Sequence, residues 1–195
     1  MHPRPISYGM DIFSHGLWAG AAAQAVNTSE KAQGFTKRRI SVWWTVVWGV
    51  FPDLFAFTIP FMWIMWQTIT GQASFGEFRP PHEPAQPNSF PMFALASSLY
   101  NISHSVIIFF LLFGVVFFIF KRPVWEMFGA LIHILSDIPT HSYSFFPTPF
   151  LWPLSDFKVN GISWGTPWFM LLNYSAIILV YTLIYRKKKT ALAKN

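Results

Sequence analysis

Apolar residues run in long stretches along this chain, and short polar or charged clusters separate the stretches. A helix needs about 20 mainly apolar residues to cross the hydrocarbon core of a membrane. Three stretches meet that length and two are shorter, which predicts helices at about 40–68, 90–120, 166–185, 12–26 and 124–138. The two shorter stretches, 12–26 and 124–138, can instead be buried or partly re-entrant helices. The pattern therefore predicts an all-α integral membrane bundle of about five transmembrane helices, built as a single membrane-embedded domain over residues 1–195.

Two longer connections differ from each other in composition. Residues 71–91 are rich in proline and polar side chains, which predicts a solvated connection without regular structure. Residues 142–164 are dense in aromatic side chains and proline, and the prolines exclude a continuous helix there. Aromatic rings favour the boundary between membrane and water, so we expect this aromatic and proline-rich loop to lie at the membrane interface, folded over helix ends.

The composition supports membrane insertion and limits the available chemistry. Hydrophobic residues make up 53% of the 195 residues and charged residues 11%, whereas soluble domains usually carry about 25% charged residues. The chain has no cysteine, so a disulfide framework and a thiolate metal site are both excluded. Any metal site must therefore use histidine nitrogen and carboxylate oxygen.

The basic residues cluster between the apolar stretches, and their placement predicts the orientation of the bundle. The main clusters fall at 31–39, 121–122 and 186–189. Five helices bring all three to one face, which we expect to be cytoplasmic because cytoplasmic loops carry an excess of Lys and Arg. The N-terminus then lies outside, and residues 186–195 form a basic cytoplasmic tail. This topology explains the net charge of +6 without a nucleic-acid partner, and we expect none.

Ionisable side chains within the predicted helices are few, and apart from Glu126 they are His or Asp. In order of the predicted helices they are Asp11 with His15, Asp53, His104, and His133 with Asp137, followed by His141 just beyond. Such side chains are costly at membrane depth, and by default they mark functional sites. Four separate helices each contribute at least one, which indicates one shared site.

The spacing of these residues agrees with metal binding. His133 and Asp137 are four residues apart and share a helix face, which allows both to bind one metal ion or two adjacent ions. Asp11 and His15 repeat this spacing, so Asp11 can be a ligand or can accept a hydrogen bond from the His15 ring. His141 lies another four residues on, although a proline interrupts the helix pattern before it.

Depth in the membrane and residue type narrow the possible roles of these His and Asp residues. By helix rise, Asp53 and His104 fall near the bilayer centre, whereas His15, Asp137 and His141 fall nearer the outer ends of their helices. A single intramembrane histidine often does no more than join two helices through a hydrogen bond. A joint set of His and Asp fits a divalent metal such as zinc, manganese or iron better than a proton relay or a cation filter.

Four short motifs occur in an order that resembles a known family. They are DIFSH at Asp11–His15, GVFPD at Gly49–Asp53, SHS at Ser103–Ser105 and HILSDIPT at His133–Thr140. Together they extend over most of the chain and resemble the YdjM-like family of membrane-bound, metal-dependent hydrolases, which is LexA-regulated in its namesake. That family commonly has His-Arg shortly before the third motif, where this chain has Tyr100 and Asn101.

The resemblance implies a helical membrane protein with one set of metal ligands. The set comprises His15, Asp53, His104, His133 and Asp137, and His141 can supplement it. The resemblance also implies a distant similarity to zinc-dependent phospholipase C, in which comparable His and Asp residues on helices hold metals. That similarity points to phosphoester hydrolysis. Asn101 can still donate a hydrogen bond where the family has Arg.

The hypothesis that follows is a metal-dependent hydrolase of the bacterial inner membrane that acts on a lipid or lipid-linked phosphoester. We expect a divalent ion, with zinc preferred over manganese or iron, and Asp11 and Asp53 as candidate catalytic residues, Asp11 acting as an outer acceptor or general base. The alternative is a non-enzymatic protein, either a small divalent-metal transporter or a structural subunit. Few polar residues lie on the cytoplasmic halves of the predicted helices, which favours the enzyme. The oligomeric state stays open.

Overall fold

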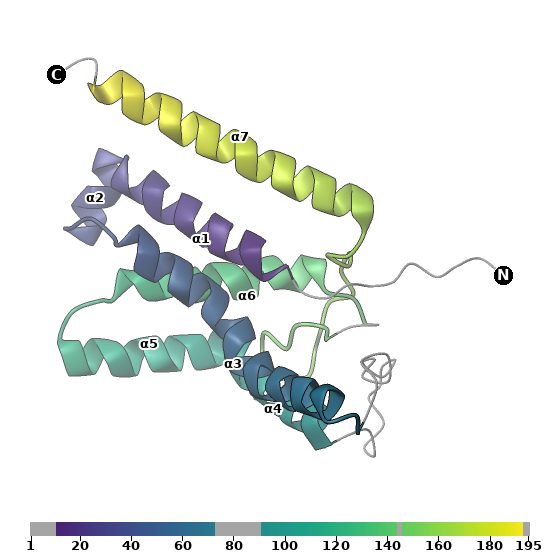
Figure 1. Ribbon diagram of the computed structural model, residues 1–195. Helices are drawn as coiled ribbons and strands as arrows, with labels where there is room; N and C mark the ends of the chain where they lie inside the picture. Colours follow the sequence, from purple (N-terminus) through teal and green to yellow (C-terminus); the bar gives the residue numbers. More distant parts are fainter. Residues whose placement is uncertain (1–10, 73–90, 144–145, 193–195) are drawn as a thin grey trace.

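The protein is all-helical in the computed structural model, which describes residues 11–72, 91–143 and 146–192 (Figure 1). These residues form seven α-helices and one short 3-10 helix, with no strand among them, which confirms the predicted all-α class. In chain order they are α1 (Ile12–Asn27), α2 (Glu30–Thr36), α3 (Val42–Ile69), α4 (Pro91–Ser103), α5 (Val106–Phe120), η2 (Trp125–Met127), α6 (Phe128–Thr140) and α7 (Pro167–Leu192). Most of the connection predicted at 71–91 lies outside the described residues.

The apolar helices make this a membrane protein. Helices α3 and α7 are each long and apolar enough to cross a bilayer, and α4 with α5 makes a third span if the bent pair is counted as one. Helix α1 has 16 residues and α6 has 13. Even α1 rises only about 24 Å, less than the ~30 Å hydrocarbon core. By length and composition the described helices therefore give two or three spans, and the predicted count of five includes two helices that fall short.

Helix α3 lies at the centre of the bundle and packs against α1, α4 and α6. Helix α7 packs along α1 on one side, and α5 contacts α6 on the other (Figure 1). The segments 31–39, 121–122 and 186–189, which hold the basic clusters, lie at the same end of the bundle, at the left of Figure 1. We call this end the basic end. Helix α7 continues through residues 186–192, so the stretch predicted as a tail is helical there.

The structure corrects the predicted single helix over 90–120, which is divided into α4 and α5 at His104 and Ser105. The two helices are bent by 61° relative to each other. The Ser105 hydroxyl accepts a hydrogen bond from the N–H of Ile108 at 3.2 Å, so it caps α5, and it donates to the carbonyl of Trp152. A distant loop therefore supplies hydrogen bonding at the break, and His104 is left at the corner between the helices.

The aromatic and proline-rich loop folds over helix ends, as the sequence predicts. Its N–H groups at Gly161, Ile162 and Trp164 donate to carbonyls at the C-terminal end of α6 at 2.7, 2.8 and 3.2 Å. Earlier in the same loop, the carbonyl of Phe150 accepts a hydrogen bond from the first residue of α5 at 3.0 Å. The loop thereby satisfies the carbonyls of Pro139, Thr140 and His141 at the end of α6.

Two glycines allow α1, α3 and α6 to approach one another closely. A Cβ at Gly129 of α6 would lie 2.2 Å from the carbonyl oxygen of Thr45 on α3. A Cβ at Gly49 of α3 would lie 2.5 Å from the Cβ of Ala19 on α1. Atoms do not approach so closely without displacement of the backbone, so both positions require glycine. This packing joins the three helices that carry His15, Asp53, His133 and Asp137.

We expect Gly129→Ala to lower the free energy of unfolding by about 1–3 kcal/mol or to prevent folding, because the added methyl group meets the backbone of α3. The matched control is Gly114→Ala in α5, where a Cβ meets nothing within 4 Å and alanine favours the helix. Thermal unfolding in detergent, followed by circular dichroism, compares the two variants. Wild-type stability in Gly129→Ala would contradict the close packing.

An ion pair at the basic end ties the segment before α3 to η2. Two guanidinium nitrogens of Arg38 donate to the Glu126 carboxylate at 2.8 and 2.6 Å, and the N–H of Ser41 donates to it at 3.0 Å. Burial by itself would raise the pKa of Glu126. The hydrogen bonds from Arg38 and Ser41 and the charge of Arg38 outweigh burial and hold this pKa below its ordinary value of 4.5.

The lowered pKa of Glu126 makes the stability of the fold depend on pH. Such a carboxylate stabilises fully above its unfolded pKa, near 4.5, and the stabilisation is lost as the pH falls through the lower folded pKa. Glu126→Gln should therefore cost about 1–2 kcal/mol at pH 7 and flatten the decline in melting temperature below pH 5. Glu30→Gln, on exposed α2, is the control. A melting temperature that falls as steeply below pH 5 in Glu126→Gln as in the wild type would refute this role.

Candidate metal centre

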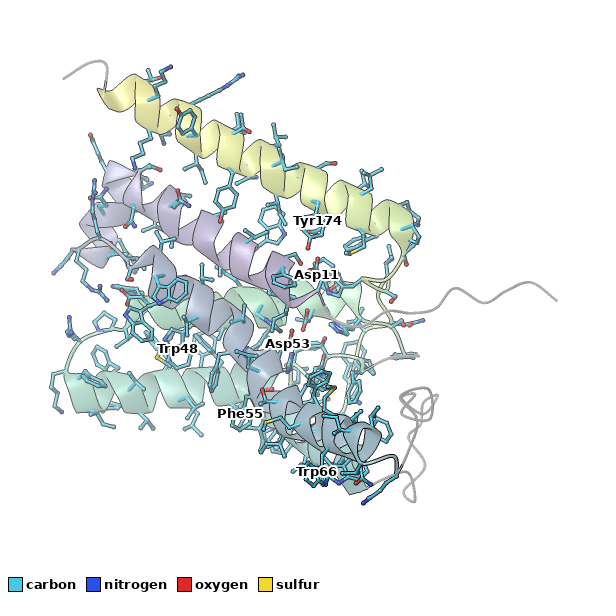
Figure 2. The ribbon with its side chains drawn as sticks, in the orientation of Figure 1. Asp11, Trp48, Asp53, Phe55, Trp66 and Tyr174 are labelled. Atoms are coloured by element: carbon cyan, nitrogen blue, oxygen red, sulfur yellow. The ribbon has the colours of Figure 1, made fainter. Side chains whose placement is uncertain are left out.

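Four of the predicted metal ligands converge inside the bundle. Asp53 comes from the middle of α3, His104 from the corner between α4 and α5, and His133 and Asp137 from one face of α6. Each of the four is at most 2% exposed, and one donor atom from each lies within 4.8 Å of the others. Figure 2 labels Asp53 on α3, near the middle of the bundle. We call these residues the four-ligand group.

The distances within the four-ligand group match those between ligands of one metal ion. The Nε2 atoms of His104 and His133 are 3.1 Å apart, and they lie 3.3 and 3.2 Å from Asp137 Oδ2. Both also lie near Asp53 Oδ1, at 3.4 and 3.5 Å. Tetrahedral ligands at ~2.0–2.1 Å from zinc are about 3.3 Å from one another. The observed separations fall close to that value.

The hydrogen bond of His133 fixes which of its ring nitrogens is free. Its Nδ1 lies 2.7 Å from the carbonyl oxygen of Gly49 on α3. A carbonyl only accepts hydrogen bonds, so Nδ1 carries the proton and donates. In a neutral ring the Nε2 atom, which faces the carboxylates, then bears a lone pair. This is the tautomer of a histidine that binds metal through Nε2.

Serine hydroxyls orient the rings of His15 and His104 in the same way. The hydroxyl of Ser136 donates to the carbonyl of the preceding turn at 2.8 Å, so its oxygen accepts from Nδ1 of His15 at 3.2 Å. The hydroxyl of Ser103 lies 2.9 Å from Nδ1 of His104 and donates to a backbone carbonyl at 3.5 Å. A neutral His15 ring therefore directs an unprotonated Nε2 toward Asp137, and the His104 ring directs its own Nε2 toward the same carboxylate.

The four-ligand group fits a divalent cation by its donor chemistry. Both oxygens of Asp53 and both oxygens of Asp137 are buried and accept no hydrogen bond within the described part of the chain. Two N–H groups on His104 and His133 could not point at each other across 3.1 Å, so at most one of the two Nε2 atoms carries a proton directed at the other. Two buried carboxylates need a positive charge near them, and a divalent cation supplies it. Nitrogen and oxygen donors without sulfur suit zinc, manganese or iron.

His15 and His141 lie on the other side of Asp137, outside the four-ligand group. Nε2 of His15 is 3.1 Å from Asp137 Oδ1, and Nδ1 of His141 is 3.5 Å from the same oxygen. The His15 ring stacks on the His133 ring, with centroids 3.8 Å apart. The two oxygens of Asp137 thus face different histidines.

Asp11 contributes to helix packing. Its Oδ1 accepts a hydrogen bond from the N–H of Ser14 at 3.3 Å, which caps α1. The same oxygen accepts a second hydrogen bond, from the hydroxyl of Tyr174 on α7, at 2.8 Å. Figure 2 shows Asp11 and Tyr174 on these neighbouring helices. Asp11 is not part of the four-ligand group, and its assignment as outer acceptor or general base stays a prediction.

Three supporting residues are apparent only in the structure. Tyr100 stacks on His104 with ring centroids 3.8 Å apart and lies on the position where the resembling family commonly has a charged pair. Ser103 and Ser136 hold the rings by the hydrogen bonds described above. In the sequence, Ser103 is adjacent to His104, Ser136 lies three residues after His133, and Tyr100 precedes His104 by one helical turn. Such spacings are equally common for residues that only pack, so the sequence does not identify these three as supporting residues.

Comparison of the chain with models of protein families, with curated proteins and with solved structures found no match. The resemblance to the YdjM-like family therefore stays a prediction that rests on the four short motifs. The candidate site itself is defined by the positions of its residues.

We expect the detergent-purified protein to retain a divalent transition metal, because the four-ligand group has donor atoms for one. Asp137→Asn, which keeps the shape and removes the charge, and His133→Ala should each reduce the bound metal at least about tenfold. Asp156→Asn, in the exposed part of the loop, is the matched control and should retain the wild-type content. Elemental analysis measures the metal per chain. Equal metal in Asp137→Asn and Asp156→Asn would exclude this site.

Proposed function

We propose that this protein is a metal-dependent hydrolase, of the kind its motifs resemble, that cleaves a lipid or lipid-linked phosphoester. The observation that carries the proposal is the four-ligand group, in which two histidine nitrogens and two buried carboxylates lie close enough together to hold one ion. A site of this kind, enclosed by helices, is the arrangement from which metal-dependent hydrolases activate water.

The residues of the group divide into ligands and a proton acceptor. His104, His133 and Asp137 Oδ2 would hold the ion, with zinc as the preferred metal. The ion, when bound, supplies Lewis-acid chemistry, since it makes water a stronger nucleophile at neutral pH and stabilises charge that develops on a phosphoryl oxygen. Asp53 contributes one oxygen to the group, and its Oδ2 is buried without a hydrogen bond, so it can accept the proton of the attacking water.

The depth of the site favours a substrate that arrives through the lipid. Asp53 lies twelve residues into the 28-residue α3, roughly 17 Å from the start of that helix. Much of the surface around it is apolar, including Leu54 and Phe55, which are 47% and 38% exposed. A lipid or lipid-linked phosphoester can reach such a depth with its chains in the bilayer. We infer that the bilayer and this substrate are the partners of the protein, with no nucleic acid among them.

We also propose the orientation in the bacterial inner membrane. The basic end would face the cytoplasm, as Lys and Arg usually do, and the C-terminal end of α7 with it. The N-terminus and the loop that covers the end of α6 would then face outward. The four-ligand group lies between the basic end and that loop, so its opening would be toward the outer face or the outer leaflet.

A divalent-metal transporter is the competing function, and the described residues weigh against it. A transporter needs polar groups that continue from the site to both faces. Toward the basic end, the buried polar residues of α3 and η2 are Thr45 and Glu126, and the first donates to a backbone carbonyl while the second pairs with Arg38. Within the described residues, the four-ligand group is the one cluster suited to a metal.

The test is hydrolysis of phosphoesters by the purified full chain in mixed micelles with added zinc. Chromogenic phosphodiesters and lipid phosphomonoesters serve as probes. We expect turnover by the wild type and by Asp156→Asn, and a loss of roughly 100-fold or more in Asp137→Asn, since ligands that act as a unit fail together. Turnover that survives unchanged in Asp137→Asn, or uptake of zinc into proteoliposomes by a protein without hydrolytic activity, would overturn the proposal.

A further inference from the structure

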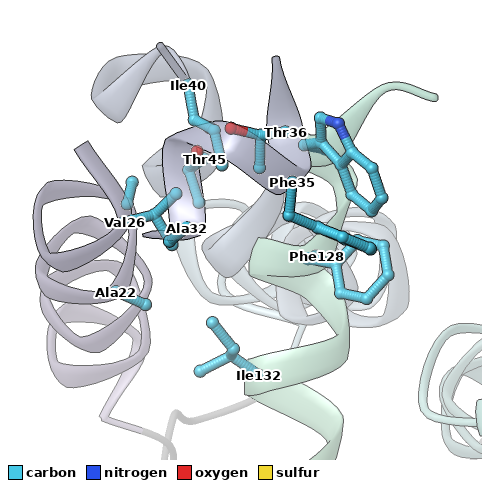
Figure 3. A pocket seen from close by; sticks show the side chains of 11 residues that line it. Ala22, Val26, Ala32, Phe35, Thr36, Ile40, Thr45, Phe128 and Ile132 are labelled. Carbon is cyan, nitrogen blue, oxygen red and sulfur yellow. The ribbon is translucent and has the colours of Figure 1, made fainter. Parts of the chain in front are cut away.

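An apolar pocket of about 290 Å³ lies at the basic end, away from the four-ligand group. Figure 3 shows it between the end of α1, helix α2 and the first turns of α6. Ala22 and Val26 of α1, Phe35 of α2, and Phe128 and Ile132 of α6 form much of its wall. None of the six candidate metal ligands lines it. The pocket is therefore a second feature of the molecule that the proposed hydrolysis does not use.

Besides the indole of Trp125, the polar side chains in the wall are two threonines, and both of their hydroxyls donate hydrogen bonds. Thr36 donates to the carbonyl of Arg38 and Thr45 donates to the carbonyl of Ser41, each at 2.8 Å. A buried water needs two to four polar partners, and cavities lined by hydrocarbon stay dry and accept apolar ligands. The pocket therefore suits a hydrocarbon occupant.

Aromatic residues place the mouth of the pocket at a membrane surface. Trp43 and Trp44, in the first turn of α3, are 69% and 58% exposed, and Phe35 at the pocket is 72% exposed. Exposed Trp beside a basic cluster is typical of the boundary between headgroups and acyl chains. Hydrocarbon that reaches a pocket at this level belongs to a membrane lipid.

The charges around the pocket select the headgroup of that lipid. Lys31, Lys37 and Arg39 are exposed on α2 and the segment after it, and none of them has an ion pair with any described residue. Arg38 differs, because it is paired with Glu126. The one acid on α2 is Glu30. An excess of cations beside an apolar pocket at the membrane surface attracts anionic lipid.

We propose that the pocket binds an acyl chain of an anionic phospholipid, whose phosphate lies against the exposed cations Lys31, Lys37 and Arg39. The acyl chain fills the space between α1, α2 and α6, and the headgroup neutralises the cations that have no protein partner. The bound lipid holds α2 against the bundle, in addition to the Arg38–Glu126 pair. This proposal is independent of the metal site and of hydrolysis.

The first test fills the pocket. The full chain in detergent is titrated with phosphatidylglycerol and with phosphatidylcholine of the same acyl chains, and native mass spectrometry counts the retained lipid. Ala22→Phe places a ring in the pocket and should weaken phosphatidylglycerol binding roughly tenfold, as the loss of a few methylene contacts would. The matched control is Ala25→Phe, an exposed position on the same helix outside the pocket, which should bind as the wild type does.

The second test removes the exposed cations and leaves the residues that line the pocket unchanged. The triple variant K31Q/K37Q/R39Q should lose phosphatidylglycerol binding on the order of 100-fold and leave phosphatidylcholine binding unchanged. The control triple K187Q/K188Q/K189Q removes the same charge from α7. Equal retention of both lipids by the wild type, or equal loss in both triples, overturns the proposal. If Ala22→Phe does not give a monodisperse protein, the comparison of the triples decides.

Discussion

The carboxylates of Asp53 and Asp137 are held inside a helix bundle, away from solvent, and histidine rings face them at 3.1–3.5 Å. The Nδ1 atom of His133 donates to a carbonyl, and serine hydroxyls lie beside the Nδ1 atoms of two further rings. The Nε2 atoms of His133 and His104 and the two carboxylates are thereby gathered at one point. A divalent cation bound there would offset the charge of the two buried carboxylates.

The fold supports this cluster through features that look unrelated along the chain. Glycines at 49 and 129 let α1, α3 and α6 touch backbone to backbone, which brings a carbonyl of α3 within 2.7 Å of the His133 ring. The break between α4 and α5 places His104 at a corner, where its ring can turn toward α6. The aromatic and proline-rich loop hydrogen-bonds to the backbone at the break and to the carbonyls at the end of α6. Irregular backbone there lies against protein and not against lipid.

The sequence predicts the class of the fold and the members of the site better than it predicts their geometry. His and Asp residues in apolar helices are conspicuous because their burial is costly, and the helical spacing of His133 and Asp137 places both on one face. The break at Ser105 could not be predicted, because the mainly apolar stretch has the composition of one helix and the hydrogen bonds that a loop makes at the break come from some 45 residues away. Asp11 has the spacing of a partner for His15, yet its hydrogen bonds go to its own helix and to Tyr174.

X-ray absorption at the edge of the metal retained by the purified protein tests the central claim most directly. The four-ligand group predicts a first shell of nitrogen and oxygen only, at about 2.0–2.1 Å for zinc, with the outer-shell scattering of two or more imidazole rings. Imidazole scattering should be absent from any metal that binds elsewhere on the surface through carboxylates. A spectrum without imidazole contributions, or one unchanged by Asp137→Asn, would contradict a metal held between α3, α6 and the corner at His104.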